Sequence, residues 1–401
     1  MDTAGNNKYE WGEGVFTLLS WFRKDKVKNA RVLVVGAGAL GNEVVKNLAL
    51  FGVGHIYIVD FDKIEITNLT RSVLFREEDA FSHSYKAEVV ARRTMELNPQ
   101  IHVNPIVGNL FSDVGLGLYR AVDVVIGCLD SRIARYQLNR LCLRAGKTWI
   151  DGGIENMSGN VRVFSPGVNC YECGLSREEF NHIMLRTGCA DVVRLQEKAG
   201  RVATTPISAS IIGAIQVQEA MKIIHQAPDG STPFKMLAGR MLRYEGLMNT
   251  MNTYRYSSWK KNCMAHDFWK NVITCEALSA TMPVREAFDV LREVLGVEGM
   301  EINMLNNKFV ERIIAEKTEE EFLTKIPESQ LDSYIGKHAE LRKLTYRTVF
   351  HKIYFENIDE SFPYQDLTLE EIGIPAFDVI QVSTEKGMYY VELTKDAPRY
   401  L

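Results

Sequence analysis

One short glycine-rich segment constrains the fold of this chain more than any other part of its sequence. The β-branched run 31–35 leads directly into residues 36–41, which read GAGALG, and a helical pattern over 42–51 follows. A second apolar run at 55–59 then ends in Asp60. A strand, a glycine-rich turn, a helix and a second strand in this order are typical of the βαβ unit that opens a nucleotide-binding parallel sheet.

The same alternation of strands and helices continues along the first half of the chain. Short apolar runs predict further strands at 101–106, 123–127, 148–151 and, as an antiparallel extension, 161–164. Helical patterns predict helices at 85–97, 134–145 and 204–225. We therefore expect an α/β fold with a Rossmann-like, doubly wound and mostly parallel sheet.

The region after about residue 282 has a different pattern, in which strands outnumber helices. An amphipathic helix is predicted at 283–295, and Thr368 with Glu371 matches a capping box. Strands are expected at 346–355, 378–382 and 388–393. This pattern of one helix followed by several strands predicts a separate C-terminal α+β domain.

Composition and charge narrow the class of protein. The chain has 401 residues, of which 46% are hydrophobic and 24% charged, as in an ordinary globular protein. Its formal net charge of −4 argues against a nucleic acid as a partner. No run approaches the about 20 apolar residues that span a bilayer, and residues 1–14 lack the apolar core of a signal peptide. We expect a cytoplasmic protein without membrane contact, whose seven cysteines are thiols, metal ligands or a nucleophile.

A glycine-rich turn of this kind, taken alone, is typical of dinucleotide-dependent dehydrogenases. Gly36, Gly38, Ala39 and Gly41 let backbone amides and a helix N-terminus approach a phosphate, and Asp60 is placed to accept hydrogen bonds from ribose hydroxyls. Hydride transfer has no need of further charged groups around the turn. Cleavage of the α–β bond of ATP needs cations for the triphosphate and a carboxylate for Mg²⁺. Five nearby residues fit this second chemistry: Asp62, Asn68, Arg71, Lys86 and Asp130.

In their order and spacing these motifs resemble those of the ThiF/MoeB-type adenylyltransferases, which activate ubiquitin and ubiquitin-like proteins, including bacterial sulfur carriers. The resemblance extends to about residue 270 and rests on 36–41, Asp60-Phe61-Asp62, 68–71, Lys86, Leu97-Asn98-Pro99 and Asp130. It implies that Asp60 holds the ribose of ATP and that Asp130 binds Mg²⁺. It also implies that Asn68, Arg71 and Lys86 surround the phosphates.

Two short motifs predict a metal site. Cys170 and Cys173 form a CxxC motif, and Cys263 and His266 form a CxxH motif far downstream. Three thiolates and one imidazole suit a closed, tetrahedral and structural Zn²⁺ site. The resemblance implies two such pairs, with a cysteine where His266 stands, and Cys275 is the alternative fourth ligand.

Cys189 is the candidate nucleophile. The resemblance implies a catalytic or persulfide-forming cysteine in this crossover segment, where a thiolate would attack the acyl-adenylate and form a thioester. Arg186 and Arg194 lie close enough in sequence to lower its pKa. The alternative is a free cysteine without function. Cys128 and Cys142 fall in strand and helix patterns and are expected in the core.

The N-terminal segment departs from the resemblance in one respect. Family members carry an arginine there that reaches the partner's nucleotide across a dimer, whereas residues 8–12 read KYEWG. Arg23 and Lys24 are the candidates to replace it. We still expect a homodimer, whose interface would cover an apolar cluster formed by Phe16, Leu18, Leu19 and Trp21.

We expect three parts: an N-terminal helical segment at 1–30, an adenylation domain at 31–278 with the metal site and the cysteine-bearing crossover, and a C-terminal α+β domain at 282–401. The last matches no motif and is ubiquitin-fold-like only by analogy with activating enzymes of conjugation pathways. The implied activity is ATP-dependent adenylation of the C-terminal glycine of a ubiquitin-like protein. Thioester formation and transfer to a conjugating enzyme would follow, in a bacterial pathway such as an antiviral one.

Three alternatives remain open from the sequence. The first is adenylation of a sulfur carrier for molybdopterin, thiamine or tRNA thiolation. The second is adenylation of a small molecule or a tRNA by the same fold, and the third is a non-catalytic subunit that only binds the modifier. No cysteine follows Cys275, so a rhodanese domain with a catalytic loop cysteine is excluded.

Overall fold

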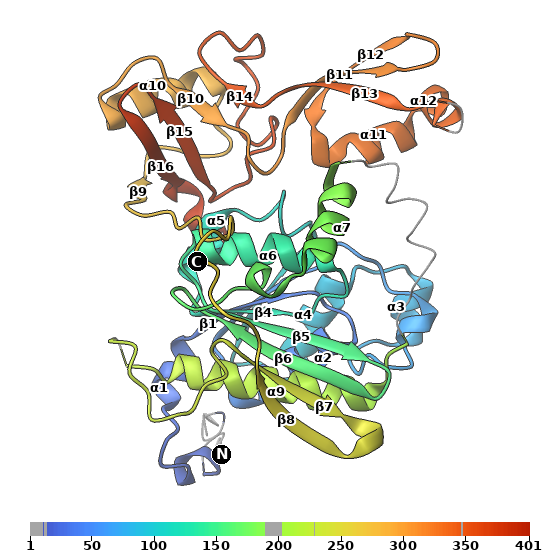
Figure 1. The fold of residues 1–401 in the computed structure, drawn as a ribbon, viewed down its shortest axis with the longest axis vertical. Coiled ribbons are helices and arrows are strands. Elements are labelled where there is room, and N and C mark those ends of the chain that lie inside the picture. Colours follow the sequence, from blue (N-terminus) through green and yellow to red (C-terminus); the bar gives the residue numbers. More distant parts are fainter. Residues whose placement is uncertain (1–10, 12–13, 189–202, 228, 346–347) are drawn as a thin grey trace, which may run out of the picture. The chain divides into compact units, whose positions relative to one another are not determined.

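The computed structural model describes residue 11 and residues 14–188, 203–227, 229–345 and 348–401, without the side chains of 184–188. The chain forms two compact units (Figure 1). The first unit comprises the described residues of Met1–Val107, Ala121–Gly188 and Glu197–Asp267. The second unit comprises the described residues of Gly108–Arg120 and Phe268–Leu401.

An eight-stranded sheet forms the centre of the first unit, in the order β3-β2-β1-β4-β5-β6-β7-β8. The first five strands in sequence run parallel: β1 (Arg31–Val35), β2 (His55–Val59), β3 (His102–Ile106), β4 (Val124–Gly127) and β5 (Trp149–Glu155). The remaining three add antiparallel strands at one edge: β6 (Ser158–Phe164), β7 (Arg240–Glu245) and β8 (Thr250–Arg255). The predicted mostly parallel, Rossmann-like sheet is thus confirmed, and its two last strands are additions that the sequence did not signal.

Helices accompany this sheet. They are α1 (Lys24–Asn29), α2 (Ala39–Phe51), α3 (Glu77–Phe81), α4 (Lys86–Leu97), α6 (Arg132–Arg144), α7 (Arg177–Gly188) and α9 (Pro206–Ile224). Val32 and Val34 of β1 share one hydrophobic core with α2, α4 and α9, whereas Leu33 between them points to the opposite face and is equally buried. Burial on both faces explains why β1 reads as a continuous apolar run.

Helix α9 is long and apolar enough, by length and composition alone, to cross a membrane. It is instead a core helix, in contact with α2 and with strands β4, β5 and β6. Its buried polar residues Gln216 and Glu219 both have hydrogen-bond partners, Gln216 with strand carbonyls and Glu219 with the backbone amide of Leu237. This packing accounts for the scarcity of charge that marked the helix in the sequence.

The second unit contains two sheets. A five-stranded sheet has the order β14-β10-β15-β16-β9, and a three-stranded sheet has the order β12-β11-β13. The strands are β9 (Ile273–Cys275), β10 (Glu301–Asn303), β11 (Phe309–Ala315), β12 (Glu321–Pro327), β13 (Phe350–Phe355), β14 (Asn357–Ile358), β15 (Val379–Thr384) and β16 (Gly387–Leu393). The helices are α5 (Leu116–Ala121), α10 (Val284–Leu295), α11 (Leu331–Lys337) and α12 (Ala339–Leu344). The predicted C-terminal sheet domain is therefore present, with α10 packed into its main core.

Candidate nucleotide site and metal centre

The glycine-rich turn between β1 and α2 is shaped by two close backbone approaches. Gly36 has a φ of +100°, and a Cβ there would meet the carbonyl oxygen of Cys128 at 2.4 Å. A Cβ at Gly41 would lie 2.0 Å from the carbonyl oxygen of Gly36. A side chain at either position would collide with backbone, which explains both glycines. Gly38 has open space where its Cβ would be, so this side of the turn can admit a ligand.

Asp60, directly after β2, holds this turn in place. Its carboxylate accepts hydrogen bonds from the backbone amides of Ala37 at 2.7 Å and Asp62 at 2.8 Å. Burial raises the pKa of Asp60, and the nearby Lys86 ammonium opposes that rise. One carboxylate thus joins the glycine-rich turn to the segment that follows β2.

Lys86, the first residue of α4, is joined to the same segment by two bonds. Its ammonium lies 2.7 Å from a carboxylate oxygen of Asp62, and its backbone amide donates to the Asp62 carbonyl at 2.9 Å. The structure therefore links the glycine-rich turn, Asp60, Asp62 and Lys86 through consecutive contacts. The turn follows the carboxyl end of β1, Asp60 and Asp62 follow that of β2, and Lys86 begins α4. Ligands bind at this edge of the sheet in open α/β folds.

Asn68 and Arg71 lie in and just after a single helical turn at Ile66–Asn68. The Asn68 side chain accepts from the backbone amide of Glu65 at 2.9 Å, and the Arg71 guanidinium donates to the carbonyl of Thr67 at 2.8 Å. Both side chains are half-buried and bonded within their own turn. Among the described residues, neither bonds to the glycine-rich turn.

Asp130 lies three residues beyond β4, and its side chain is exposed. It does not cap the next helix, because the Ser131 hydroxyl does so, accepting from the amides of Ile133 at 3.2 Å and Ala134 at 3.4 Å. An exposed carboxylate supplies the hard oxygen ligand that Mg²⁺ prefers. Asp130 is therefore not the cap of α6, and its carboxylate is exposed to solvent.

Sequence reasoning missed two buried polar residues: Asn42, which supports the turn, and Gln216, which bonds to the neighbouring strands β4 and β5. The Asn42 amide donates to the carbonyls of Ala37 and Gly38, both at 2.9 Å, and its oxygen accepts from the Leu74 amide. The Gln216 amide donates to the carbonyl of Gly127 at the end of β4, at 2.9 Å. The available signal was a polar side chain inside an apolar helix pattern.

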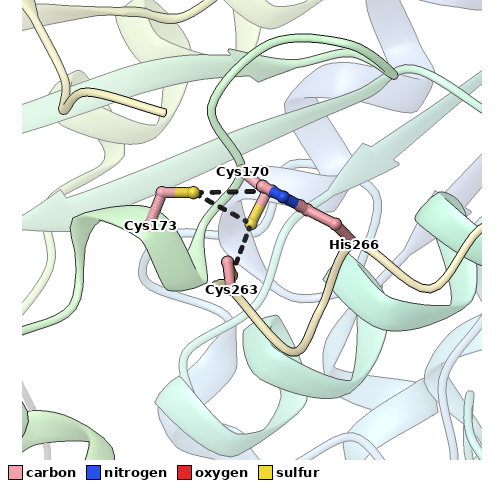
Figure 2. A group of neighbouring side chains, drawn as sticks. All are labelled: Cys170, Cys173, Cys263 and His266. Carbon is pink, nitrogen blue, oxygen red and sulfur yellow. Dashed lines mark hydrogen bonds between the residues drawn. The ribbon is translucent and has the colours of Figure 1, made fainter. Parts of the chain in front are cut away.

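The four predicted metal ligands meet in space (Figure 2). The ligand atoms of Cys170, Cys173, Cys263 and His266 all lie within 4.8 Å of one another. Cys170 and Cys173 are buried, and the other two are partly exposed. Cys275, the alternative ligand, lies instead in the hydrophobic core of the second unit and is not part of this group.

Three distances within this group match the edges of a tetrahedral zinc site. The sulfur atom of Cys170 lies 3.8 Å from those of Cys173 and Cys263, and the Cys173 sulfur lies 3.5 Å from the ring nitrogen of His266. A zinc ion with bonds of about 2.3 Å to sulfur and about 2.0 Å to nitrogen sets edges of about 3.8 Å and about 3.5 Å. The residues present therefore suit Zn²⁺.

The pKa shifts of two of the four ligands, His266 and Cys263, also favour metal binding. Burial lowers the pKa of His266, which favours the neutral ring that binds metals. A hydrogen bond with Cys170 lowers the pKa of Cys263 to about 6, so its thiolate is accessible at neutral pH. Both changes favour the metal-binding form of the side chain, whereas the same hydrogen bond with Cys263 raises the pKa of the Cys170 thiol.

Local structure orients the side chains within each pair. Each pair closes a turn by one backbone hydrogen bond. The amide of Cys173 donates to the carbonyl of Cys170, and the amide of His266 donates to the carbonyl of Cys263, both at 3.2 Å. These equivalent turns aim both side chains of a pair in one direction. Glu172, between the two cysteines of the first pair, forms a forked ion pair with Arg140 of α6 at 3.0 and 3.2 Å, which fixes the first turn against the domain.

The remaining cysteines separate into two groups. Burial raises the pKa of the Cys128 and Cys142 thiols, which disfavours the reactive thiolate in both. Cys142 is buried in the core as expected, whereas Cys128 is only partly buried and packs against the edge of the core. Cys189 and Arg194 lie outside the described residues, as does the Arg186 side chain. Residues 8–10 and 12 of the N-terminal motif also lie outside them.

Comparison with known proteins identifies the family. A family model described as "ThiF family" matches residues 16–265. The chain is 36% identical over 157 residues to the SUMO-activating enzyme subunit uba-2 of Caenorhabditis elegans, covering 38% of this chain and 27% of that protein. It is 32% identical over 239 residues to the adenylyltransferase and sulfurtransferase MOCS3 of Drosophila sechellia, covering 59% of this chain and 48% of that protein.

A solved structure gives the same result for the fold. The crystal structure of E. coli MccB with AMPCPP and MccA matches with a TM-score of 0.51 and 25% sequence identity, covering 65% of this chain and 75% of that chain. The chain spans half or less of the length of the two curated relatives named above.

Proposed function

The chain belongs to the ThiF family, and from this premise we propose that it uses ATP to adenylate the C-terminal glycine of a ubiquitin-like protein. The observation that carries the proposal is the bonded group of the glycine-rich turn, Asp60, Asp62 and Lys86 at the carboxyl end of the parallel sheet. Two relatives, named as a SUMO-activating enzyme subunit and as an adenylyltransferase, support the same chemistry.

Each residue has a role in this reaction. Backbone amides at the start of α2 bind phosphate oxygens, helped by the positive end of the helix dipole. Asp60 fixes the turn and accepts from the ribose. The Lys86 ammonium, with Arg71 and Asn68 after a rearrangement of their turn, stabilises negative charge on the phosphates. Mg²⁺, when bound, neutralises triphosphate charge, and Asp130 would hold it.

The proposed bond changes balance without a further reactant. A carboxylate oxygen of the terminal glycine attacks the α-phosphorus of ATP. The bond from that phosphorus to the oxygen bridging the β-phosphate breaks, and pyrophosphate leaves. The product is an acyl-adenylate, whose mixed anhydride retains enough energy for transfer to a thiol or another acceptor.

A second step on the enzyme is part of the proposal. The Cys189 thiolate would attack the acyl carbon and expel AMP, giving a thioester that passes to a conjugating enzyme. A bacterial conjugation pathway, including an antiviral one, is the expected setting, and the genes beside this one would test it. Adenylation of a sulfur carrier is the second candidate, favoured by the MOCS3 relatives.

The metal centre and the assembly complete the proposal. We assign Zn²⁺ in the Cys₃His group a structural role, because four protein ligands leave no open position for chemistry. A homodimer is expected as well. The charged residues of the nucleotide site are all present, and hydrogen bonds and an ion pair link the glycine-rich turn, Asp60, Asp62 and Lys86. Both facts argue against a non-catalytic subunit.

Pyrophosphate exchange tests the proposal directly. With Mg²⁺, ATP and a candidate ubiquitin-like protein, labelled pyrophosphate should enter ATP, and the same protein lacking its last glycine should support no exchange. Replacement Asp130→Ala should abolish exchange in a folded protein. Exchange that is independent of the terminal glycine would contradict the proposal.

A non-reducing gel separates the two candidates. Conjugation predicts a higher-mass species that a thiol reductant removes and that Cys189→Ala lacks, although Cys189→Ala retains exchange. Cys128→Ala is the matched control and should retain both. Exchange without any thiol-sensitive species would favour the sulfur-carrier candidate.

A further inference from the structure

A buried group of three charges lies beside the candidate nucleotide site. The Asp151 side chain in β5 is fully buried, and it accepts from Arg135 Nε at 2.8 Å and from Arg162 Nε at 2.9 Å. Burial acts to raise the pKa of Asp151, but the two guanidinium groups, Arg162 before Arg135, hold it below its ordinary value. Asp151 therefore remains a carboxylate inside the domain.

Arg135 does more than neutralise this carboxylate. Its Nη2 donates to the carbonyl of Leu129 and to the carbonyl of Gly152, the latter at 3.1 Å. Leu129 is the residue immediately before Asp130. One planar guanidinium from the first turn of α6 thus joins β5 to the backbone that presents the candidate magnesium ligand.

Arg162 fixes the other side of Asp151. Its guanidinium lies over the rings of Tyr171, at 5.3 Å, and Tyr256, at 5.2 Å. The Tyr256 hydroxyl in turn donates to the Tyr171 carbonyl at 3.1 Å. Aromatic faces attract a cation and restrict its position, so Arg162 holds Asp151 in one place.

Stability alone does not explain this arrangement. Desolvating a carboxylate and two guanidinium groups is costly, and replacing such buried ions by apolar residues is often neutral or stabilising. A rigid fork that donates to one carboxylate and two carbonyls instead provides a fixed geometry, which a lysine ammonium cannot reproduce. Through its bond to the Leu129 carbonyl, the Arg135 guanidinium fixes the backbone next to Asp130.

We propose that Arg135 is a positioning residue, which holds the Leu129–Asp130 backbone so that the Asp130 carboxylate is placed for the divalent cation of the nucleotide. Asp151 and Arg162 act through Arg135 by fixing its guanidinium. The inference rests on the proposed function, because it takes Asp130 as a metal ligand.

The test is the dependence of nucleotide chemistry and binding on the divalent cation. Arg135→Lys should raise the Mg²⁺ concentration for half-maximal pyrophosphate exchange by about tenfold or more, as loss of an outer-shell partner does in metal sites. The maximal rate at saturating Mg²⁺ should fall much less, and binding of ATP without Mg²⁺ should not change. Arg162→Lys, a milder change two contacts away, should shift the Mg²⁺ dependence in the same direction by a smaller factor.

Arg140→Lys is the matched control, since Arg140 also lies on α6 and also pairs with a buried carboxylate, that of Glu172. It should leave the Mg²⁺ dependence unchanged. The proposal is overturned if folded Arg135→Lys keeps the wild-type Mg²⁺ dependence. It is also overturned if Arg135→Lys and Arg140→Lys lower activity and melting temperature in parallel.

A binding measurement separates this inference from the proposed function. Electron paramagnetic resonance counts Mn²⁺ bound to the protein–ATP complex without requiring turnover. Weaker Mn²⁺ binding in Arg135→Lys, in a protein that supports no exchange, would refute the function and retain the positioning role. Wild-type Mn²⁺ binding in a variant of an active enzyme would refute the positioning role alone.

Discussion

The Lys86 ammonium lies 2.7 Å from the Asp62 carboxylate, across 24 positions of the sequence. Asp62 is 53% exposed, whereas Lys86 is only 13% exposed. The pair is therefore open to solvent on the carboxylate side, and phosphate oxygens can compete for the ammonium. The contact holds the Lys86 ammonium beside the segment that follows β2.

Replacement Lys86→Gln should separate chemistry from stability. An ion pair exposed on one side contributes about 1 kcal/mol or less to folding, so the free energy of unfolding should hardly change. Loss of a charge that stabilises the transition state should lower exchange by about 100-fold or more. Denaturant unfolding and pyrophosphate exchange measure the two quantities, and exchange within threefold of wild type would contradict the assigned role.

Purified protein should contain about one zinc ion per chain. His266→Ala should lose the metal and unfold at a lower temperature, because a closed site contributes folding free energy. Cys275→Ala is the control: it opens a cavity in the second unit yet should keep the full metal content. Metal analysis of the three proteins checks this, and the reverse pattern would replace His266 by Cys275 in the ligand set.

Acid should remove the contribution of Asp151 to stability. Its pKa is below the ordinary value of 3.8 in the folded protein, so its stabilising effect is complete above that value and is lost as the pH falls toward the folded pKa. Asp151→Asn should cost about 3 kcal/mol at pH 7, because two buried arginines lose their partner. The difference in unfolding free energy between wild type and variant should shrink below about pH 4. A difference that stays constant down to pH 2 would show that Asp151 is not stabilised as a carboxylate.

The N-terminal apolar cluster should divide into an inner and an outer part. Phe16 stacks on Phe51 with ring centroids 5.5 Å apart, whereas Leu18 is 83% exposed. If this surface forms the homodimer, Leu18→Glu should give monomers in light scattering without changing the melting temperature. Phe16→Ala should instead lower the melting temperature. A wild-type protein that is monomeric at working concentrations would contradict the predicted assembly.

The sequence predicted the first βαβ unit because each of its signals is local. A continuous apolar strand, glycines where a side chain would strike backbone, and a carboxylate at the next strand end all lie within 31–60. The metal ligands could be predicted for the same reason, because each pair of ligands lies within four consecutive residues. Their meeting in space follows from the fold and not from either motif.

Other elements were missed for physical reasons. Strand β8 is exposed along its whole length, so no alternation of buried and exposed residues marks it in the sequence. Strands β11 and β12 pair across a register shift between Val310 and Arg312, which interrupts the two-residue period. The Arg135–Asp151 contact could not be predicted from the sequence either, because a buried ion pair consists of the same residue types as an exposed one.

The two halves of the metal centre are 93 positions apart, with α9, β7 and β8 encoded between them. During synthesis at about 5–20 residues per second, Cys170 and Cys173 emerge about 5–20 s before Cys263 does. A metal ion captured in that interval has only two protein ligands. The closed site can form only after the edge strands have been made, so metal binding reports the completion of this unit on the ribosome.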